Sequence, residues 1–158
     1  MNIEERLVFL LKEKKYKISF AESMTGGMLA SSVINVSGAS EVIEKSFITY
    51  SDKAKNEILK VSFETIKRFD VVSKEVVLEM LNGLKSICDS DVLCTISGYA
   101  SGYLKNKGKV CYAISINGNF FVNEIIINGS RNTVRKKTTK IIMKDIYIVI
   151  SQTGTLLS

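Results

Sequence analysis

The chain has 158 residues, of which 46% are hydrophobic and 24% charged, and its net charge is +6 at pH 7. This composition is typical of a globular protein, and the sequence predicts a single domain over residues 1–158. Histidine is absent, which excludes a Ser-His-Asp triad, a Cys-His pair and a histidine-based zinc site.

The cysteines indicate the compartment. Cys88, Cys94 and Cys111 lack the spacing of metal ligands, and their odd number argues against a disulfide framework. The N-terminus is amphipathic and unlike a signal peptide, and no apolar run approaches the ~20 residues of a membrane span. We therefore expect a cytoplasmic protein with reduced thiols, no membrane contact, no metal and no cofactor.

The first 70 residues alternate between helical and strand patterns. The helix expected at the N-terminus has Asn2 as a plausible cap. The elements expected here are helix, strand, helix, strand, helix and a short helical turn, over residues 2–15, 17–22, 25–35, 43–50, 52–59 and 62–68.

The remaining residues continue this alternation and then turn back on themselves. Ser73 is expected to cap a helix with a clean apolar stripe. A strand, a polar loop, a hairpin around Asn117-Gly118-Asn119 and a final helix follow, over residues 91–96, 97–109, 110–127 and 130–148. Alternation followed by a hairpin predicts a three-layer α/β/α sandwich with one mixed, mostly parallel sheet.

The most informative segment is Ala21-Glu22-Ser23-Met24-Thr25-Gly26-Gly27, which joins the first expected strand to a helix. Two adjacent glycines let backbone N–H groups approach a ligand, and a helix N-terminus favours negative charge. Ser23 and Thr25 could cap the helix and also line a pocket. We interpret this turn as the floor of a site for an anionic or acyl substrate.

Without histidine, a serine–lysine pair is the natural hydrolytic arrangement, provided that the pKa of the lysine is lowered. Lys55 is the best candidate for the base, because it lies in the first turn of the expected 52–59 helix and close to Lys53. The plain alternative is a solvent-facing lysine. Ser40 and Ser23 are rival nucleophiles, and Tyr50 ends a strand where it could donate a hydrogen bond.

These motifs together resemble the CinA C-terminal domain family (competence/damage-inducible protein), whose characterised members include nicotinamide mononucleotide amidohydrolases. The residue 21–27 segment is similar to the family's opening motif. Further similar segments follow in the family's order, at residues 38–40, 47–55, 71–76 and 95–98 and at Arg131 and Arg135. The resemblance covers roughly residues 5 to 148 and implies the same α/β/α fold.

The resemblance implies that Ser40 and Lys55 form a catalytic dyad that deamidates nicotinamide mononucleotide to nicotinate mononucleotide and ammonia. Tyr50 and Ser23 are expected beside the dyad. The residues expected to bind substrate lie in three glycine- or arginine-bearing segments: Thr25, Gly26, Gly27, Ser97, Gly98, Arg131 and Arg135. Arg131 and Arg135 are one helical turn apart, which suits a phosphate.

The segment over residues 98–108 departs from the family's glycine-rich loop. The family's proline and glycine pair are missing here, and Tyr99 and Tyr103 are bulkier than the residues expected. This difference supports an alternative hypothesis, in which the protein binds a nucleotide or a partner but no longer turns substrate over.

The expected partners are a small pyridine nucleotide and further copies of the chain, in a homo-oligomer. The positive charge lies mostly in residues 101–158, but the i, i+4 spacing of Lys136, Lys140 and Lys144 is typical of a solvated helix face. No aromatic residues interleave with these lysines to stack bases, so we do not expect the protein to bind nucleic acid.

Overall fold

The computed structural model describes residues 1–101 and 106–153. In this part of the chain one five-stranded sheet has the order β2-β1-β3-β4-β5. The strands are β1 (Ile18–Glu22), β2 (Ile43–Ile48), β3 (Val92–Gly98), β4 (Lys109–Ile116) and β5 (Asn119–Ile126). β1 pairs in parallel with β2 and β3, whereas β4 runs antiparallel to β3 and β5. The sheet is therefore mixed, with β4 alone pointing the opposite way.

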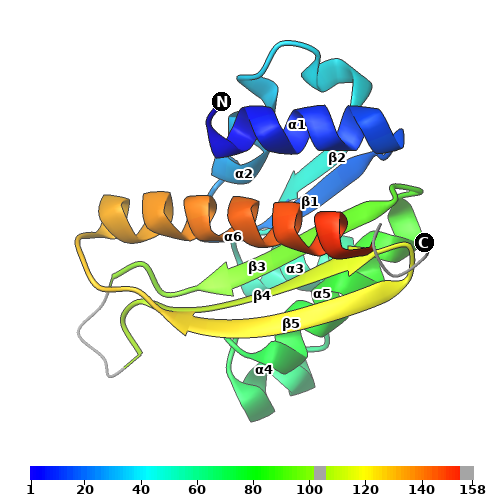
Figure 1. Ribbon diagram of the computed structural model, residues 1–158. Helices are drawn as coiled ribbons and strands as arrows, with labels where there is room; N and C mark the ends of the chain where they lie inside the picture. The colour runs from blue at the N-terminus through cyan, green and yellow to red at the C-terminus, as the bar shows by residue number, and fades with distance from the viewer. Residues whose placement is uncertain (102–105, 154–158) are drawn as a thin grey trace.

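Helices cover both faces of the sheet, as Figure 1 shows. The helices are α1 (Ile3–Lys14), α2 (Met28–Ile34), α3 (Asp52–Leu59), α4 (Phe63–Phe69), α5 (Lys74–Ile87) and α6 (Arg131–Thr153), with a short 3₁₀ turn, η1, at Ala39–Glu41. One apolar core lies between the sheet and α1, α2 and α6, and a second between the sheet and α3 and α5. This is the expected three-layer α/β/α architecture.

Local signals in the sequence produce several of these elements. Asn2 and Glu5 form a reciprocal capping box at the start of α1, and Ser73 accepts a hydrogen bond from Val76 N–H at the start of α5. Asn117 and Gly118 both have positive φ and form the two-residue turn between β4 and β5. Both predicted caps and the predicted hairpin are confirmed.

Several boundaries differ from expectation. α2 begins at Met28 and not at residue 25, and β2 ends at Ile48, so Tyr50 lies outside the strand. The largest extensions are in β3 and α6. β3 continues to Gly98, two residues beyond the predicted strand, because Ser97 and Gly98 pair with Cys111 and Val110 of β4. α6 continues to Thr153, because the buried face that includes Ile146 continues past residue 148 to Ile150. None of the helices in the described ranges is both long enough and apolar enough to cross a bilayer.

Candidate functional site

A cleft of about 230 Å³ lies at the carboxyl ends of β1 and β3. The chain leaves β1 through α2 to reach β2 on one side, and β3 pairs with β1 on the other, so this is a switch point of the sheet, where α/β proteins bind ligands. Its walls come from both helical layers: Ser23, Met24, Tyr50, Asp52, Lys55, Val71, Val72, Ser97, Gly98, Tyr99, Ala100, Ser101 and Arg131.

Lys55 lies in this cleft but is almost entirely shielded from solvent, with 1% of its surface exposed. Its Nζ atom is 2.9 Å from Ser23 Oγ, 2.8 Å from the Thr49 carbonyl oxygen and 3.0 Å from the Tyr50 carbonyl oxygen. Ser51 caps α3, which fixes the first turn of the helix and so the position of Lys55. The structure therefore brings together Lys55 and Ser23, two of the side chains that the sequence singled out.

Burial changes the acidity of this amine. It lowers the pKa of Lys55 from the ordinary 10.5 to about 8, and the Asp52 carboxylate opposes the shift. At pH 7 about a tenth of such amines are neutral, whereas for a free lysine the neutral fraction is below about one in a thousand. The site therefore contains a usable population of the neutral base.

The three partners of Lys55 determine what happens when it loses a proton. As an ammonium, Lys55 donates to all three oxygens, while Ser23 Oγ lies 3.5 Å from the Tyr50 carbonyl and can donate to it. As an amine, Lys55 keeps two N–H donors, and the two carbonyls can only accept. The lone pair then faces Ser23, which alone of the three carries a proton to give. Deprotonation thus converts the Ser23 hydroxyl into a donor to Lys55.

Ser23 follows the last residue of β1 and is buried, with 6% of its surface exposed. The turn after it contains Gly26 and Gly27, with φ of 58° and 99°. Glu22, completely buried, accepts hydrogen bonds from the N–H groups of Leu29 and Ala30. The predicted capping of α2 by Ser23 or Thr25 is therefore wrong, because the carboxylate of Glu22 accepts the hydrogen bonds from the first turn of the helix.

The structure does not support the expectation that Thr25, Gly26 and Gly27 form the floor of a site for an anionic or acyl substrate. The negative charge of Glu22 already occupies the N-terminus of α2, where an anion was expected to bind. Thr25 is fully buried, and none of these three residues lines the cleft. The turn therefore carries Ser23 into the cleft but does not itself line it.

The predicted pairing of Ser40 with Lys55 is wrong within one chain. Ser40 lies in η1, before β2, whereas Lys55 lies in α3, after β2. Ile43 at the start of β2 pairs with Ile18 at the start of β1, while Ile48 pairs with Glu22 at its end. A six-residue strand spans roughly 20 Å, so Ser40 lies near the N-terminal end of β2, whereas the amine of Lys55 lies beyond its C-terminal end. The strand expected over residues 43–50 already separates Ser40 from Lys55 in the sequence, so its length could have revealed this.

The two arginines of α6 have different partners. Arg131 lines the cleft and donates to Ser101 Oγ at 2.7 Å and to Tyr50 Oη at 3.0 Å. Tyr50 accepts this bond and keeps its own hydroxyl proton available to a ligand. Arg135 instead donates to the backbone carbonyls of Met24 and Thr25. The expected phosphate clamp therefore reduces to Arg131.

The end of β3 forms another wall of the cleft. Ser97 lines the cleft and donates to the Val71 carbonyl, so its hydroxyl can only accept a hydrogen bond from a ligand. Gly98 packs closely against Met24: a Cβ at position 98 would lie 2.3 Å from Met24 Sδ, so the methionine side chain would have to move. Tyr99 donates to Asp70, which together with burial raises the pKa of its phenol. Of the residue 98–108 segment, 102–105 lie outside the described residues.

Sequence reasoning missed most of the cleft's apolar wall and also Asp52. Met24, Val71 and Val72 carry no chemical signature and reach the cleft only through folding. Asp52 could have been found, since it lies three residues before Lys55 on the same helix. No group of three or more potential metal ligands occurs among the described residues.

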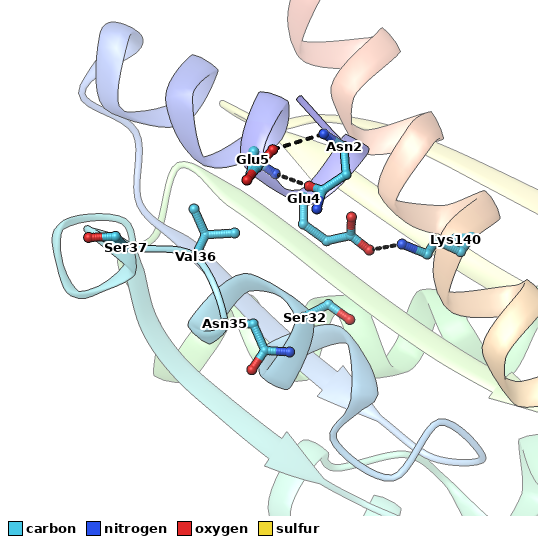
Figure 2. A pocket seen from close by; sticks show the side chains of 8 residues that line it. All are labelled: Asn2, Glu4, Glu5, Ser32, Asn35, Val36, Ser37 and Lys140. Atoms are coloured by element: carbon cyan, nitrogen blue, oxygen red, sulfur yellow. Dashed lines mark hydrogen bonds and ion pairs between the residues drawn. The ribbon is translucent and has the colours of Figure 1, made fainter.

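A second cavity, of about 360 Å³, lies between α1, α2 and α6, away from the cleft (Figure 2). Some of its polar groups have structural partners: Asn2 and Glu5 form the capping box of α1, and Glu4 Oε1 pairs with Lys140 of α6. The second oxygen of this carboxylate, Glu4 Oε2, is buried and has no hydrogen-bond partner among the described residues. The cavity shares no lining residue with the cleft. Pairing with Glu4 also occupies one of the lysines that give the C-terminal region its positive charge.

The fold and the cleft define a three-layer α/β/α protein with a buried serine–lysine pair at a switch point of its sheet. Residues 1–150 match the family model of the CinA C-terminal domain, so the chain belongs to that family. It is 40% identical over 142 residues to a CinA-like protein of Petrotoga mobilis and 43% identical over 139 residues to one of Fervidobacterium nodosum. These matches cover 87% and 84% of this chain but only 35% and 33% of the relatives.

Solved structures give the same assignment. A CinA superfamily protein of Klebsiella pneumoniae 700603 aligns with a TM-score of 0.90 and 25% identity, covering 95% of this chain and 96% of the other. A competence or damage-inducible protein of Enterobacter asburiae aligns with a TM-score of 0.89 and 28% identity, over 94% of this chain and 96% of the other. The predicted family and fold class are therefore confirmed.

Proposed function

We propose that this protein is a metal-independent amidohydrolase that deamidates nicotinamide mononucleotide, with Ser23 as nucleophile and Lys55 as general base. The observation that carries the proposal is the 2.9 Å contact between Ser23 Oγ and the buried Nζ of Lys55. Nucleophile and base within hydrogen-bond reach are the geometric requirement for this chemistry. The choice of nucleotide rests on the family resemblance.

In the proposed reaction Ser23 Oγ attacks the carboxamide carbon and its proton passes to Lys55. The tetrahedral intermediate collapses as Lys55 returns a proton to the amide nitrogen, which breaks the C–N bond and releases ammonia. Water, deprotonated by Lys55, then attacks the ester on Ser23. The C–Oγ bond breaks, Ser23 regains its proton, and nicotinate mononucleotide leaves.

The cleft offers complementary groups to the rest of such a substrate. Arg131, at the rim, supplies a guanidinium for the phosphate, and the Tyr50 hydroxyl beside it can donate a further hydrogen bond. Met24, Val71 and Val72 provide an apolar wall for the pyridine ring. The cleft therefore offers both a cation for the anionic group and an apolar wall for the ring of such a substrate.

The test is ammonia release by the purified protein supplied with nicotinamide mononucleotide, compared with free nicotinamide and nicotinamide riboside. We expect release from the mononucleotide and much slower release from the two compounds that lack phosphate. Lys55→Met preserves the length and bulk of the side chain but removes the base, so it should abolish turnover. Ammonia release that survives Lys55→Met would refute the proposed mechanism.

A non-catalytic nucleotide-binding protein is the second candidate. It is favoured by Tyr99, whose bulky ring lines the cleft and whose hydroxyl is bound to Asp70. Such a protein would be stabilised by the mononucleotide in a thermal-shift measurement and would release no ammonia. Stabilisation together with turnover supports the enzyme.

A further inference from the structure

We propose that Arg135 is a positioning residue, which holds the turn that carries Ser23 and does not bind substrate; this rests on the proposed function. The Arg135 side chain reaches from α6 to the segment that follows β1. Its Nε atom donates to the Met24 carbonyl oxygen at 2.7 Å, and Nη2 donates to the Thr25 carbonyl oxygen at 3.2 Å.

These two carbonyls belong to the residues directly after Ser23. The guanidinium is planar and rigid, so two hydrogen bonds from it fix the orientations of two successive peptide groups. The Met24 carbonyl belongs to the peptide group that joins Met24 to Thr25, one residue beyond Ser23, so fixing it restricts the backbone of Met24 and holds the turn that carries the Ser23 side chain. A lysine at position 135 could supply a charge but not two fixed donors.

The Ser23 turn depends on such an external support. After the last residue of β1, the turn has its own hydrogen bonds from Gly26 N–H to the Ser23 carbonyl and from Met28 N–H to the Thr25 carbonyl. Gly26 and Gly27 in the left-handed region make its backbone more permissive than that of other residues. A contact from outside the segment therefore limits its freedom.

α6 is a rigid base for that contact. It runs for 23 residues, and Val134, Thr138 and Ile142 are buried against the rest of the protein. The Cα position of Arg135 is thus fixed by core packing. The space is tight, because a Cβ on Gly26 would lie 3.0 Å from Arg135 Nη2.

The neighbouring arginine provides a matched control. Arg131 is one turn earlier on the same helix and lines the cleft, whereas Arg135 does not. If Arg131 binds substrate and Arg135 positions Ser23, equivalent substitutions must affect different kinetic constants. Arg131→Met should raise KM, and Arg135→Met should lower kcat, since a misplaced nucleophile slows chemistry without loosening the ligand.

The experiment compares both variants with wild type in the ammonia-release assay. For Arg135→Met we expect kcat to fall about 10- to 100-fold with KM changed less than about threefold. Added guanidinium chloride should restore part of the kcat of Arg135→Met and none of that of Ser23→Ala. Arg135→Lys should retain intermediate activity. A raised KM with unchanged kcat in Arg135→Met would overturn the inference and return Arg135 to the phosphate site.

Two readouts do not depend on the nucleotide. A fluorophosphonate probe labels an activated serine by forming an Oγ–P bond and expelling fluoride, and its rate at Ser23 should fall in Arg135→Met. Amide hydrogen exchange at Gly26 and Met28 should become faster in that variant, because the turn loses its support. If wild type releases no ammonia while these two effects are present, the proposed substrate fails and the positioning role stands. Unchanged labelling and unchanged exchange would contradict the role directly.

Discussion

Lys55 is the residue on which the proposed chemistry depends, and its burial has an energetic consequence. Removing an ammonium from water is unfavourable, and the three oxygens around Nζ compensate only in part. The same desolvation that lowers its pKa makes the amine a base near neutral pH. The protein thus accepts a destabilising buried group at the position where a neutral amine is needed.

The pH dependence of turnover follows from this. Lys55 must be neutral to accept the Ser23 proton, so kcat/KM should rise with pH and level off above a pKa of about 8. The measurement is the pH–rate profile of ammonia release under conditions where the substrate does not titrate. A profile flat between pH 6 and 9 would contradict Lys55 as the base.

Asp52 provides a way to move that profile. Its carboxylate raises the pKa of Lys55 against the effect of burial, and it lies one helical turn before the lysine. Asp52→Asn removes the charge with little change in shape, so the acidic limb of the profile should shift to lower pH. Asp89→Asn is a suitable control, because Asp89 does not line the cleft. A shift of the acidic limb to higher pH in Asp52→Asn would show that the Asp52 carboxylate does not raise the pKa of Lys55.

Lys55 should also make stability depend on pH. Its folded-state pKa of about 8 lies below the ordinary 10.5, so between these values the unfolded chain holds a proton that the folded protein has lost. Stability therefore rises with pH across this window, and the burial penalty is present in full below pH 8. The total is about 3 kcal/mol. The measurement is urea unfolding of wild type and Lys55→Met between pH 7 and 10.5. The free energy of unfolding of wild type should increase over this range, and that of Lys55→Met should lack this increase.

At the scale of elements, the contact between α3 and α5 fixes where Lys55 lies. Gly83 of α5 packs directly against the backbone of Leu59, the last residue of α3. A Cβ at position 83 would lie 2.0 Å from the Leu59 carbonyl oxygen. Because the obstructing atom is backbone, a helix must move to relieve the clash.

Gly83→Ala therefore sets two effects against each other. Alanine in a helix gains about 1 kcal/mol over glycine, whereas overpacking costs about 1–3 kcal/mol and more where backbone must shift. We expect the clash to dominate, with a net loss on the order of 2 kcal/mol in urea unfolding. Asn82→Ala, at an exposed neighbouring position, should be neutral or slightly stabilising. Stabilisation by Gly83→Ala would mean that α3 and α5 are less tightly packed.

The sequence predicted elements better than it predicted contacts between them. Local signals such as the Asn2 cap, the Ser73 cap and the Asn117-Gly118 turn act over a few residues, and all three were found correctly. Glu22 caps a helix seven residues away in the chain, which no short-range rule anticipates. Ser40 failed as the partner of Lys55 because β2 separates them.

At the scale of the whole molecule, the cleft joins the two helical layers. Lys55 comes from the layer of α3 and α5, and Arg131 comes from α6 on the other face (Figure 1). Ser23, directly after β1, and the Val71–Val72 segment, before α5, also line the cleft. A ligand that spans from Lys55 to Arg131 would therefore stabilise both layers relative to the unfolded chain.

Binding without turnover can be measured in a variant that lacks the nucleophile. Nicotinamide mononucleotide at 100 times its Kd should stabilise Ser23→Ala by about 2.7 kcal/mol, which raises Tm on the order of 5–10 °C for a chain of this size. Arg131→Met in the same background should lose most of this shift. An equal shift in both proteins would mean that Arg131 does not hold the phosphate.

The proposed mechanism depends above all on which serine faces the Lys55 amine. The sequence left Ser23 and Ser40 as alternative nucleophiles, and of these two only Ser23 lies beside Lys55 in the structure. The direct measurement is the initial rate of ammonia release from nicotinamide mononucleotide by Ser23→Ala and Ser40→Ala, assayed beside wild type. We predict that Ser23→Ala falls to the background rate while Ser40→Ala stays within about twofold of wild type. Loss of activity in Ser40→Ala with activity retained in Ser23→Ala would contradict the proposed site.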